Sequence, residues 1–252
     1  MNRILFTSEE LSPDGIASFD DARAEHVLNV LHGSVGQVLK TGVVDGPIGT
    51  ATIESIAPLP PNPETGAARG RITVRCRHDA APLAPWIDII LAPPRPRAFK
   101  RLLPQLAALG VGNIVLVGAE KVEKAFWGAQ VLRPEIYRPL FIDGLMQSGT
   151  TAMPAMRIEK SFRRYVESGR LAEEFASRPC FVAHPADEIS AIGASAAVRG
   201  DGRIVLAIGP EGGWTDGEVA LLESLGFRRI SLGARILRTD TALIALIARL
   251  MA

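Results

Sequence analysis

The sequence has few cysteines and no long apolar run, and these shortages argue against several classes of protein. Cys76 and Cys180 lie far apart and form no C-x-x-C pattern, so neither a disulfide framework nor a zinc site is expected. No apolar run approaches the roughly 20 residues of a membrane span, and the N-terminus lacks the apolar core of a signal peptide. We therefore expect a cytoplasmic protein with no resident metal and no membrane association.

Both common phosphate-binding fingerprints are missing as well. No G-x-x-x-x-G-K-[ST] occurs, and the glycines Gly209, Gly212 and Gly213 do not match G-x-G-x-x-G. The acidic residue that would bind a ribose is also absent from its expected place. Nucleoside triphosphates and dinucleotides are therefore disfavoured as ligands.

A strong overall charge is absent, but the basic residues are unevenly distributed. The 252 residues carry 28 Lys and Arg against 27 Asp and Glu, a net charge of +1. Residues 84–170 contain 13 basic and 7 acidic residues, whereas residues 1–78 contain 7 and 9. The local basic excess suits an anionic partner such as RNA, and a solvated helix surface is the other interpretation.

Residue patterning predicts two domains with a boundary near 80–85, where Pro82 and Pro85 flank a short linker. Short strands with glycine-rich turns, and one helix, predict a small β-barrel in the first part. The pieces are strands at 3–6, 37–40, 50–56 and 71–75 and a helix at 21–31. The second part alternates apolar strands with helices, which predicts an α/β fold with a mostly parallel sheet. The expected strands are 86–92, 113–117, 156–158, 180–183, 204–208 and 229–232, and the expected helices are 97–109, 129–146, 162–176, 216–225 and 242–252.

Two glycine-containing loops follow predicted strands near the C-terminus. The first is Ile208-Gly209-Pro210-Glu211-Gly212-Gly213, and the second runs over 232–242. Because loops at the carboxyl ends of parallel strands form the ligand crevice of such sheets, the two would build one small-molecule pocket. Glu211 would order its loop or meet a cation or a ligand amine, or it would accept hydrogen bonds from the next helix. Thr215 and Glu218 have the spacing of a capping box.

The second loop places the apolar pair Ile236-Leu237 between Arg235 and Arg238. An apolar pair in a loop suits packing against a flat ring such as adenine. Thr239 would cap the terminal helix. An ordinary strand-to-helix turn with two solvated arginines is the alternative interpretation.

Taken together, the two loops resemble those of the RsmE family, ribosomal RNA uridine-N3 methyltransferases of the SPOUT class. The resemblance extends to Ala183-His184-Pro185 and to the N-terminal His26-Val27-Leu28-x-Val30-Leu31 with Gly36 and Asp45-Gly46. It implies a PUA-like RNA-binding barrel over 1–80 and a SPOUT methyltransferase domain with a trefoil knot over 84–252. It further implies a homodimer that binds S-adenosylmethionine and methylates uridine N3 in 16S ribosomal RNA within the small subunit.

The resemblance also implies which residues hold the cofactor. They are Ala183, His184, Pro185, Ile208, Gly209, Pro210, Glu211, Gly212, Gly213, Leu232, Gly233, Ile236, Leu237, Arg238, Thr239, Thr241 and Ala242. The segment after the first strand of the second domain departs from the family pattern, since Ala107-Ala108-Leu109-Gly110 replaces the usual Glu-Leu-Gly ending. The alternatives are the same chemistry on another RNA site and an RNA-binding paralogue without catalysis.

Arginines and an amide are the candidate catalytic residues. We expect Arg95 or Arg97, together with Arg238, to face the uracil and a phosphate, and Gln147 to hydrogen-bond to the base edge. A positive group near the base would stabilise the negative charge that develops as N3 loses its proton. Each arginine could instead contact a phosphate or solvent only. His184 is a base by residue type, and a structural residue at a strand end is the competing interpretation.

Overall fold

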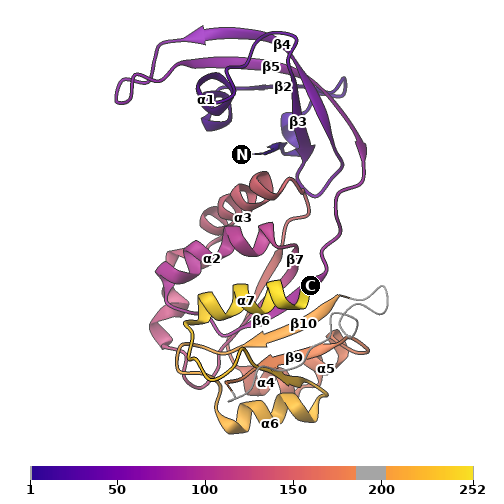
Figure 1. Ribbon diagram of the computed structural model, residues 1–252, viewed down its shortest axis with the longest axis vertical. Helices are drawn as coiled ribbons and strands as arrows, with labels where there is room; N and C mark the ends of the chain where they lie inside the picture. The colour runs from indigo at the N-terminus through magenta and orange to yellow at the C-terminus, as the bar shows by residue number, and fades with distance from the viewer. Residues whose placement is uncertain (1, 186–202, 252) are drawn as a thin grey trace. The chain divides into compact units, whose positions relative to one another are not determined.

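The computed structural model describes residues 2–185 and 203–251, which divide into two units (Figure 1). The first unit contains Met1–Leu83 and Ile142–Met153, and the second contains Ala84–Phe141 and Pro154–Ala252. The chain therefore leaves the first unit near residue 84 and re-enters it at residue 142. The expected boundary near 80–85 lies beside the first crossing, and the second crossing has no counterpart in the sequence analysis.

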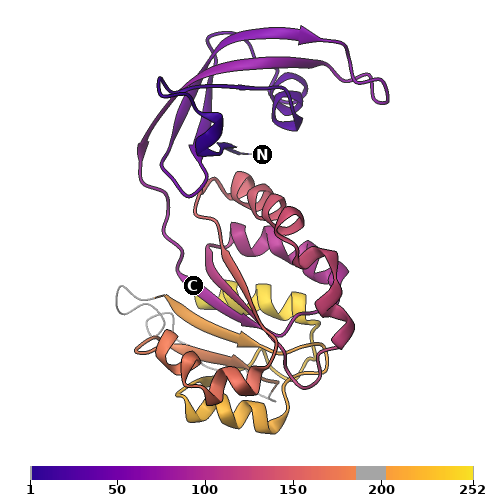
Figure 2. The same ribbon diagram turned by 180° about the vertical axis from the view of Figure 1, so that it is seen from behind.

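The first unit is built on a five-stranded sheet in the order β1-β3-β4-β5-β2. Its strands are β1 (Ile4–Phe6), β2 (Ile16–Phe19), β3 (Val38–Val43), β4 (Ile48–Leu59) and β5 (Arg69–Ala80), and its helices are the short η1 (Ser8–Glu10) and α1 (Ala22–Asn29). Only the β1–β3 pair is parallel. The helix α1 lies against the sheet (Figure 2) and buries Ala24 and Val27 in a core that includes Ile53 and Ile72. The helix, the β3–β4 hairpin and two of the other strands, β1 and β5, match the predictions in position, whereas β2 was not predicted.

The returning segment, residues 142–153, is bound into the first unit by buried polar groups. The Arg3 guanidinium donates to the carbonyl oxygens of Gly149, at 2.8 Å, and of Thr41, at 2.6 Å. Thr151 bonds to the β3–β4 turn twice, since its Oγ1 donates to Gly46 O and its own carbonyl oxygen accepts from Asp45 N. Burial of the guanidinium lowers the Arg3 pKa from its usual value. These contacts make the segment part of the first unit's fold.

The second unit contains a six-stranded, wholly parallel sheet in the order β11-β9-β10-β6-β7-β8. Its strands are β6 (Ile87–Leu91), β7 (Val111–Val117), β8 (Ala155–Glu159), β9 (Cys180–Ala183), β10 (Ile204–Ile208) and β11 (Arg228–Ile230). Every residue of β6 and β10 is buried, because helices cover both faces of the sheet. The predicted α/β class with a mostly parallel sheet is confirmed.

Helices α2 and α7 lie on one face of this sheet, and α4, α5 and α6 lie on the other (Figure 1). The helices are α2 (Pro96–Ala108), α3 (Pro134–Ser148), α4 (Phe162–Glu167), α5 (Arg170–Glu174), α6 (Asp216–Ser224) and α7 (Thr239–Met251), with short 3-10 turns η2 (Lys124–Gly128) and η3 (Gln130–Leu132). In the part of the chain that the structure describes, no helix combines the length and the apolar character that crossing a membrane requires.

Three helix predictions were wrong in their boundaries. The single helix expected over 162–176 is two helices, because Gly169 takes a left-handed conformation with φ of +77°. The helix expected from residue 129 begins at Pro134, a residue suited to the first turn, and continues through Pro139. The terminal helix begins at Thr239 rather than at residue 242, and its expected end, residue 252, lies outside the described residues.

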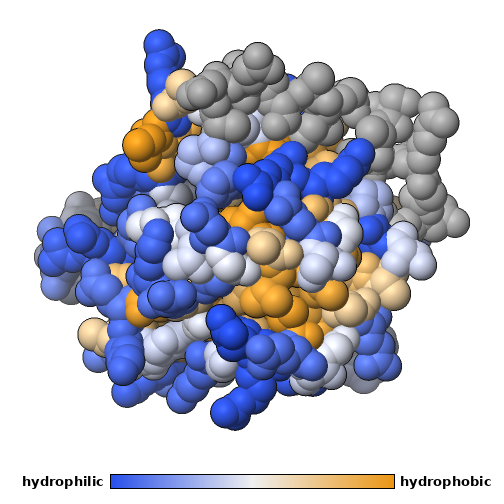
Figure 3. All heavy atoms as spheres, turned by 90° about the horizontal axis from the view of Figure 1, so that it is seen from below, coloured by the Kyte–Doolittle hydropathy of each residue, from blue (hydrophilic) through white to orange (hydrophobic). Residues whose placement is uncertain are grey.

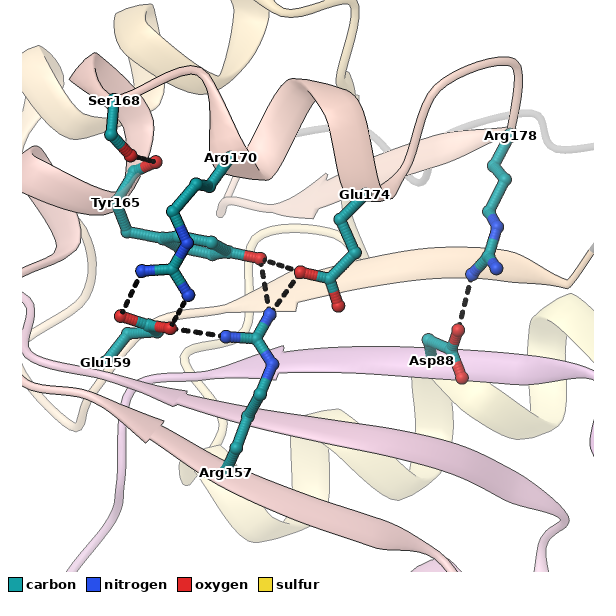
Figure 4. Close-up of polar contacts among 8 residues, drawn as sticks. All are labelled: Asp88, Arg157, Glu159, Tyr165, Ser168, Arg170, Glu174 and Arg178. Atoms are coloured by element: carbon teal, nitrogen blue, oxygen red, sulfur yellow. Dashed lines mark hydrogen bonds and ion pairs between the residues drawn. The ribbon is translucent and has the colours of Figure 1, made fainter.

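Charged side chains join α4 and α5 to the edge strand β8 (Figure 4). Arg157 donates to Glu159 and to Tyr165, and it forms an ion pair with Glu174. Arg170 forms a second ion pair with Glu159, at 2.5 Å. Burial raises the pKa of the Tyr165 hydroxyl above its usual value, and so does its hydrogen bond to Glu174. The cluster is balanced in charge and fixes the position of α4 and α5.

A buried carboxylate joins the starts of several strands in the same unit. Asp88 on β6 is fully buried and forms ion pairs with Arg178 at 2.5 Å and with Arg203 at 3.0 Å. The Asp88 carboxylate also accepts a hydrogen bond from Asn113 N at 2.7 Å. Arg178 precedes β9 and Arg203 precedes β10, so one carboxylate connects three neighbouring strands and β7.

Candidate functional site

A cavity of about 310 Å³ lies where β9, β10 and β11 end and α7 begins. The two predicted loops and the residues after β9 form its walls. The lining residues are Ala183, His184, Pro185, Ile208, Gly209, Pro210, Glu211, Gly212, Gly213, Trp214, Ile230, Ser231, Leu232, Gly233, Arg235, Ile236, Leu237, Thr239, Ala242 and Leu246. The position of the cavity, at the carboxyl ends of parallel strands, is the usual place for a ligand in an open α/β sheet.

The first loop is a tight turn that only glycine can form at two positions. Gly213 N donates to Pro210 O at 2.8 Å, and Gly213 itself has φ of +70°. A β-carbon added at Gly209 would lie 2.8 Å from Trp214 N, which is closer than such atoms approach. The turn therefore brings main-chain atoms to the cavity wall without side chains between them.

Two preceding strand ends hold this loop in place. The Glu211 carboxylate accepts a hydrogen bond from Arg95 N at 2.9 Å, which links the loop to the segment after β6. Lys121 Nζ, from the segment after β7, donates to Gly212 O at 2.9 Å. The predicted role of Glu211 in ordering its loop thus has a specific partner, the main chain at Arg95.

The helix that follows the loop starts with the predicted capping box. Thr215 Oγ1 accepts from Glu218 N, and the Glu218 carboxylate accepts from Thr215 N at 2.9 Å. The same carboxylate accepts from Glu120 N at 2.8 Å. Trp214, just before the cap, is buried against Phe162 with ring centroids 5.2 Å apart. The base of the first loop is thereby anchored in the core of the unit.

The second loop exposes its apolar pair at the cavity. Gly233 has φ of +96°, and its amide donates to Ser231 Oγ at 3.0 Å. Ile236 is 88% exposed, which is unusual for a large apolar side chain that lines a cavity. Thr239 Oγ1 donates to Gly209 O at 3.4 Å, so the start of α7 contacts the first loop directly. The exposed isoleucine provides an apolar surface that a flat ring could cover.

The cavity brings together all the residues predicted to hold a cofactor except Arg238 and Thr241. It also includes Trp214, Ile230 and Leu246, which the sequence analysis did not select. Leu246 lies one helical turn after Ala242, so the period of α7 could have identified it. Trp214 directly follows the glycine turn, but an aromatic residue there is equally typical of a core position.

Comparison with known proteins gives a consistent family. The protein-family model that is described as an RNA methyltransferase domain matches residues 81–251 of this chain. A ribosomal RNA small subunit methyltransferase E from Treponema pallidum is 31% identical over 253 residues, which cover 100% of this chain and 91% of that protein. This chain belongs to the RsmE family.

Solved structures have the same fold as this member of the RsmE family. A methyltransferase from Legionella pneumophila, solved with its bound cofactor S-adenosylmethionine, has a TM-score of 0.68 at 24% identity, and the match covers 99% of this chain and 96% of that one. A ribosomal RNA small subunit methyltransferase E from Neisseria gonorrhoeae, bound to S-adenosylmethionine, has a TM-score of 0.64 at 24% identity with the same coverage. These likenesses concern the fold.

The four residues predicted to act in RsmE catalysis are divided between the two units, with three in the second unit and one in the first. Arg95 and Arg97 are exposed at the start of α2, and Arg238 is exposed before α7. Arg238 forms an ion pair with Asp240, at 3.6 Å, and Arg101 of α2 reaches the same carboxylate at 3.5 Å. The fourth residue, Gln147, belongs to the first unit, where its carbonyl oxygen accepts from the Asn2 side chain.

His184 directly follows the last residue of β9. Its amide donates to Ile230 O at 3.1 Å, and the residue lines the cavity. The described residues contain no group of three or more His, Cys, Asp or Glu side chains that could hold a metal ion.

Apolar side chains also gather on the surface. Seen from below the view of Figure 1, apolar residues form an area framed by hydrophilic side chains (Figure 3). A separate groove between α2 and α7 has mainly apolar and small side chains. It is lined by Ala98, Leu102, Gln105, Asp240, Thr241, Ile244, Ala245 and Ala248.

Proposed function

We propose that this RsmE-family chain transfers a methyl group from S-adenosylmethionine to uridine N3 of 16S ribosomal RNA. The observation that carries the proposal is the cavity where β9, β10 and β11 end, built from the two loops that also carry the family resemblance. A bound S-adenosylmethionine supplies an activated methyl group on a positively charged sulfur. The chain's own residues must then bind the donor, exclude water and align the acceptor.

The lining residues suit such a cofactor. Ile236 and Leu237 offer the apolar surface for an adenine ring, and Leu246 adds to the apolar wall. Gly209 and Gly233 also line the wall, where the lack of a side chain lets a ligand approach the main chain closely. These features favour a flat heterocycle with a polar tail.

For catalysis, positioning is the main requirement. Holding two reactants in line can contribute about 7–11 kcal/mol in favourable cases. Uracil N3 must lose its proton, and the negative charge then spreads to O2 and O4, where Arg95, Arg97 or Arg238 would stabilise it. Gln147 would hydrogen-bond to the base edge. Because N3 is hidden in a base pair, the target uridine must be unpaired or flipped out.

The same proposal assigns the remaining parts of the molecule. The first unit would be a PUA-like RNA-binding domain and the second a SPOUT domain with a trefoil knot. The protein would act as a cytoplasmic homodimer in which the groove between α2 and α7 covers the same groove of a second copy. Support comes from the small and apolar side chains of that groove, including Ala98, Ile244 and Ala248.

The decisive experiment compares modified nucleosides in 16S ribosomal RNA from cells with and without this gene. We expect N3-methyluridine to disappear in the deletion strain and to return when the gene is restored. Persistence of N3-methyluridine together with loss of another methylated nucleoside would replace the proposed site with another RNA site. If no methylated nucleoside changes, the protein is an RNA-binding paralogue without catalysis.

A further inference from the structure

The cavity contains a single acidic side chain among the described residues that line it. That residue is Glu211, at the tip of the first loop. Its carboxylate accepts a hydrogen bond from Arg95 N at 2.9 Å, so the charged group is held at a defined place on its loop. Ordering a loop needs only a hydrogen-bond acceptor, which a glutamine would also provide. The negative charge therefore needs a separate explanation.

The chemistry of methyl transfer explains the need for a negative charge, and this explanation rests on the proposed function. As the methyl group passes to uracil N3, the pair of electrons in the sulfur–methyl bond stays on sulfur. The positively charged sulfonium of S-adenosylmethionine would thus become the neutral thioether of S-adenosylhomocysteine, and the proton lost from N3 would pass to solvent. Donor and product therefore differ by one methyl group and by one positive charge.

A fixed negative charge responds to that difference whatever the detailed pose of the ligand. Charges interact appreciably within a Debye length, which is about 8 Å at physiological ionic strength. Glu211 is one of the residues that line the cavity of about 310 Å³, so a ligand bound there lies beside the loop that carries this charge. We propose that Glu211 makes the site selective by charge, so that it binds the sulfonium donor in preference to the thioether product.

Two other ionisable side chains lie among the described residues that line the cavity. Arg235 is an exposed cation, and among the described residues no ion pair holds its guanidinium, so it can extend into solvent. His184 is placed by its amide, which donates to Ile230 O. Glu211 differs from both because its charged group itself is held in place, by the hydrogen bond from Arg95 N. Among the charged residues that the structure describes in the cavity lining, Glu211 is thus the one whose charged group has a fixed place.

The preference would assist turnover as well as binding. Product and donor share the adenosine and the amino-acid tail, so contacts to those parts hold both equally and slow the release of product. A contact with the sulfonium charge exists only before transfer. Its loss on transfer weakens the binding of the product relative to a new donor, and this favours exchange.

The test uses isothermal titration calorimetry on the full chain, with Glu211→Gln as the variant. Glutamine keeps the acceptor for Arg95 N and removes the charge. The ligands are S-adenosylmethionine, S-adenosylhomocysteine and sinefungin, in which a charged amine replaces the sulfonium. Asp216→Asn is the matched control, because Asp216 is exposed at the start of α6 and does not line the cavity.

We expect Glu211→Gln to weaken the two cationic ligands by about fivefold or more and to leave S-adenosylhomocysteine within about twofold, which is the range of a partly screened charge pair. The wild-type preference should also shrink as salt is raised, and Asp216→Asn should retain it. An equal loss for all three ligands, or no loss, would overturn charge selection and leave Glu211 as a loop-ordering residue. Failure of the wild-type chain to bind any of the three would instead reject the proposed function.

Discussion

Replacement of Gly209 by alanine tests whether the tight turn of the first loop is required for ligand binding. The added β-carbon would lie 2.8 Å from Trp214 N, 3.1 Å from Gly213 C and 3.2 Å from Trp214 Cδ1. Two of these atoms belong to the main chain, which cannot rotate away as a flexible side chain can. Overpacking of this kind costs about 1–3 kcal/mol. The turn between Pro210 and Gly213 should open to relieve it.

If the turn opens, binding must close it again, and 1–3 kcal/mol corresponds to a loss of affinity of about 5- to 150-fold. Calorimetry with S-adenosylmethionine measures that loss, and thermal unfolding should show a decrease of several degrees. Gly217→Ala is the control, since nothing lies within 4 Å of its added carbon and it occupies α6. Alanine there should leave affinity unchanged and stabilise the helix by about 0.5–1 kcal/mol. Wild-type affinity and unfolding temperature in Gly209→Ala would refute the argument.

Three further predictions concern charge and burial. Arg238→Ala should lower the rate of RNA methylation at least tenfold, which is the scale of a lost charge-stabilising group, while S-adenosylmethionine still binds. The control is Arg163→Ala, because Arg163 is also exposed. Unchanged activity of Arg238→Ala would show that Arg238 does not act in catalysis. Asp88→Ala should lower the free energy of unfolding in urea by about 3 kcal/mol, since it leaves two arginines without their partner; a loss below about 1 kcal/mol would contradict this. Burial raises the pKa of Cys76 and of Cys180 to about 11, so both thiols should resist alkylation at pH 8 until the protein unfolds. Rapid alkylation of the native protein at pH 8 would contradict this prediction.

Local signals made the candidate site predictable. Strand ends, glycines and a capping box are properties of a few neighbouring residues, and in a parallel sheet all strand ends meet at one edge. The spacing of Thr215 and Glu218 therefore predicted the start of α6 within a residue. The two loops were also expected to share one cavity, and they do.

Contacts between distant residues were not predictable in the same way. The Arg95 amide that meets Glu211 is 116 residues away in the sequence, and a main-chain donor leaves no mark in the residue pattern. The strand β2 was missed because it is short and its residues Ala17 and Ser18 have little strand preference. Its pairing with β5 compensates for that weak preference.

The return of residues 142–153 to the first unit has a consequence for the order in which the chain folds. A protein grows from its N-terminus, and domains usually fold as units as soon as they are complete. Here residues 1–83 are synthesised before Gly149, whose carbonyl oxygen accepts a hydrogen bond from Arg3. The β3–β4 turn likewise lacks its hydrogen bond from Thr151 Oγ1 to Gly46 O until Thr151 has been synthesised. Synthesis must pass residue 153 before the first unit can close, and by then β6, α2 and β7 of the second unit have already emerged. The two units therefore overlap in time during folding, although their sheets are separate.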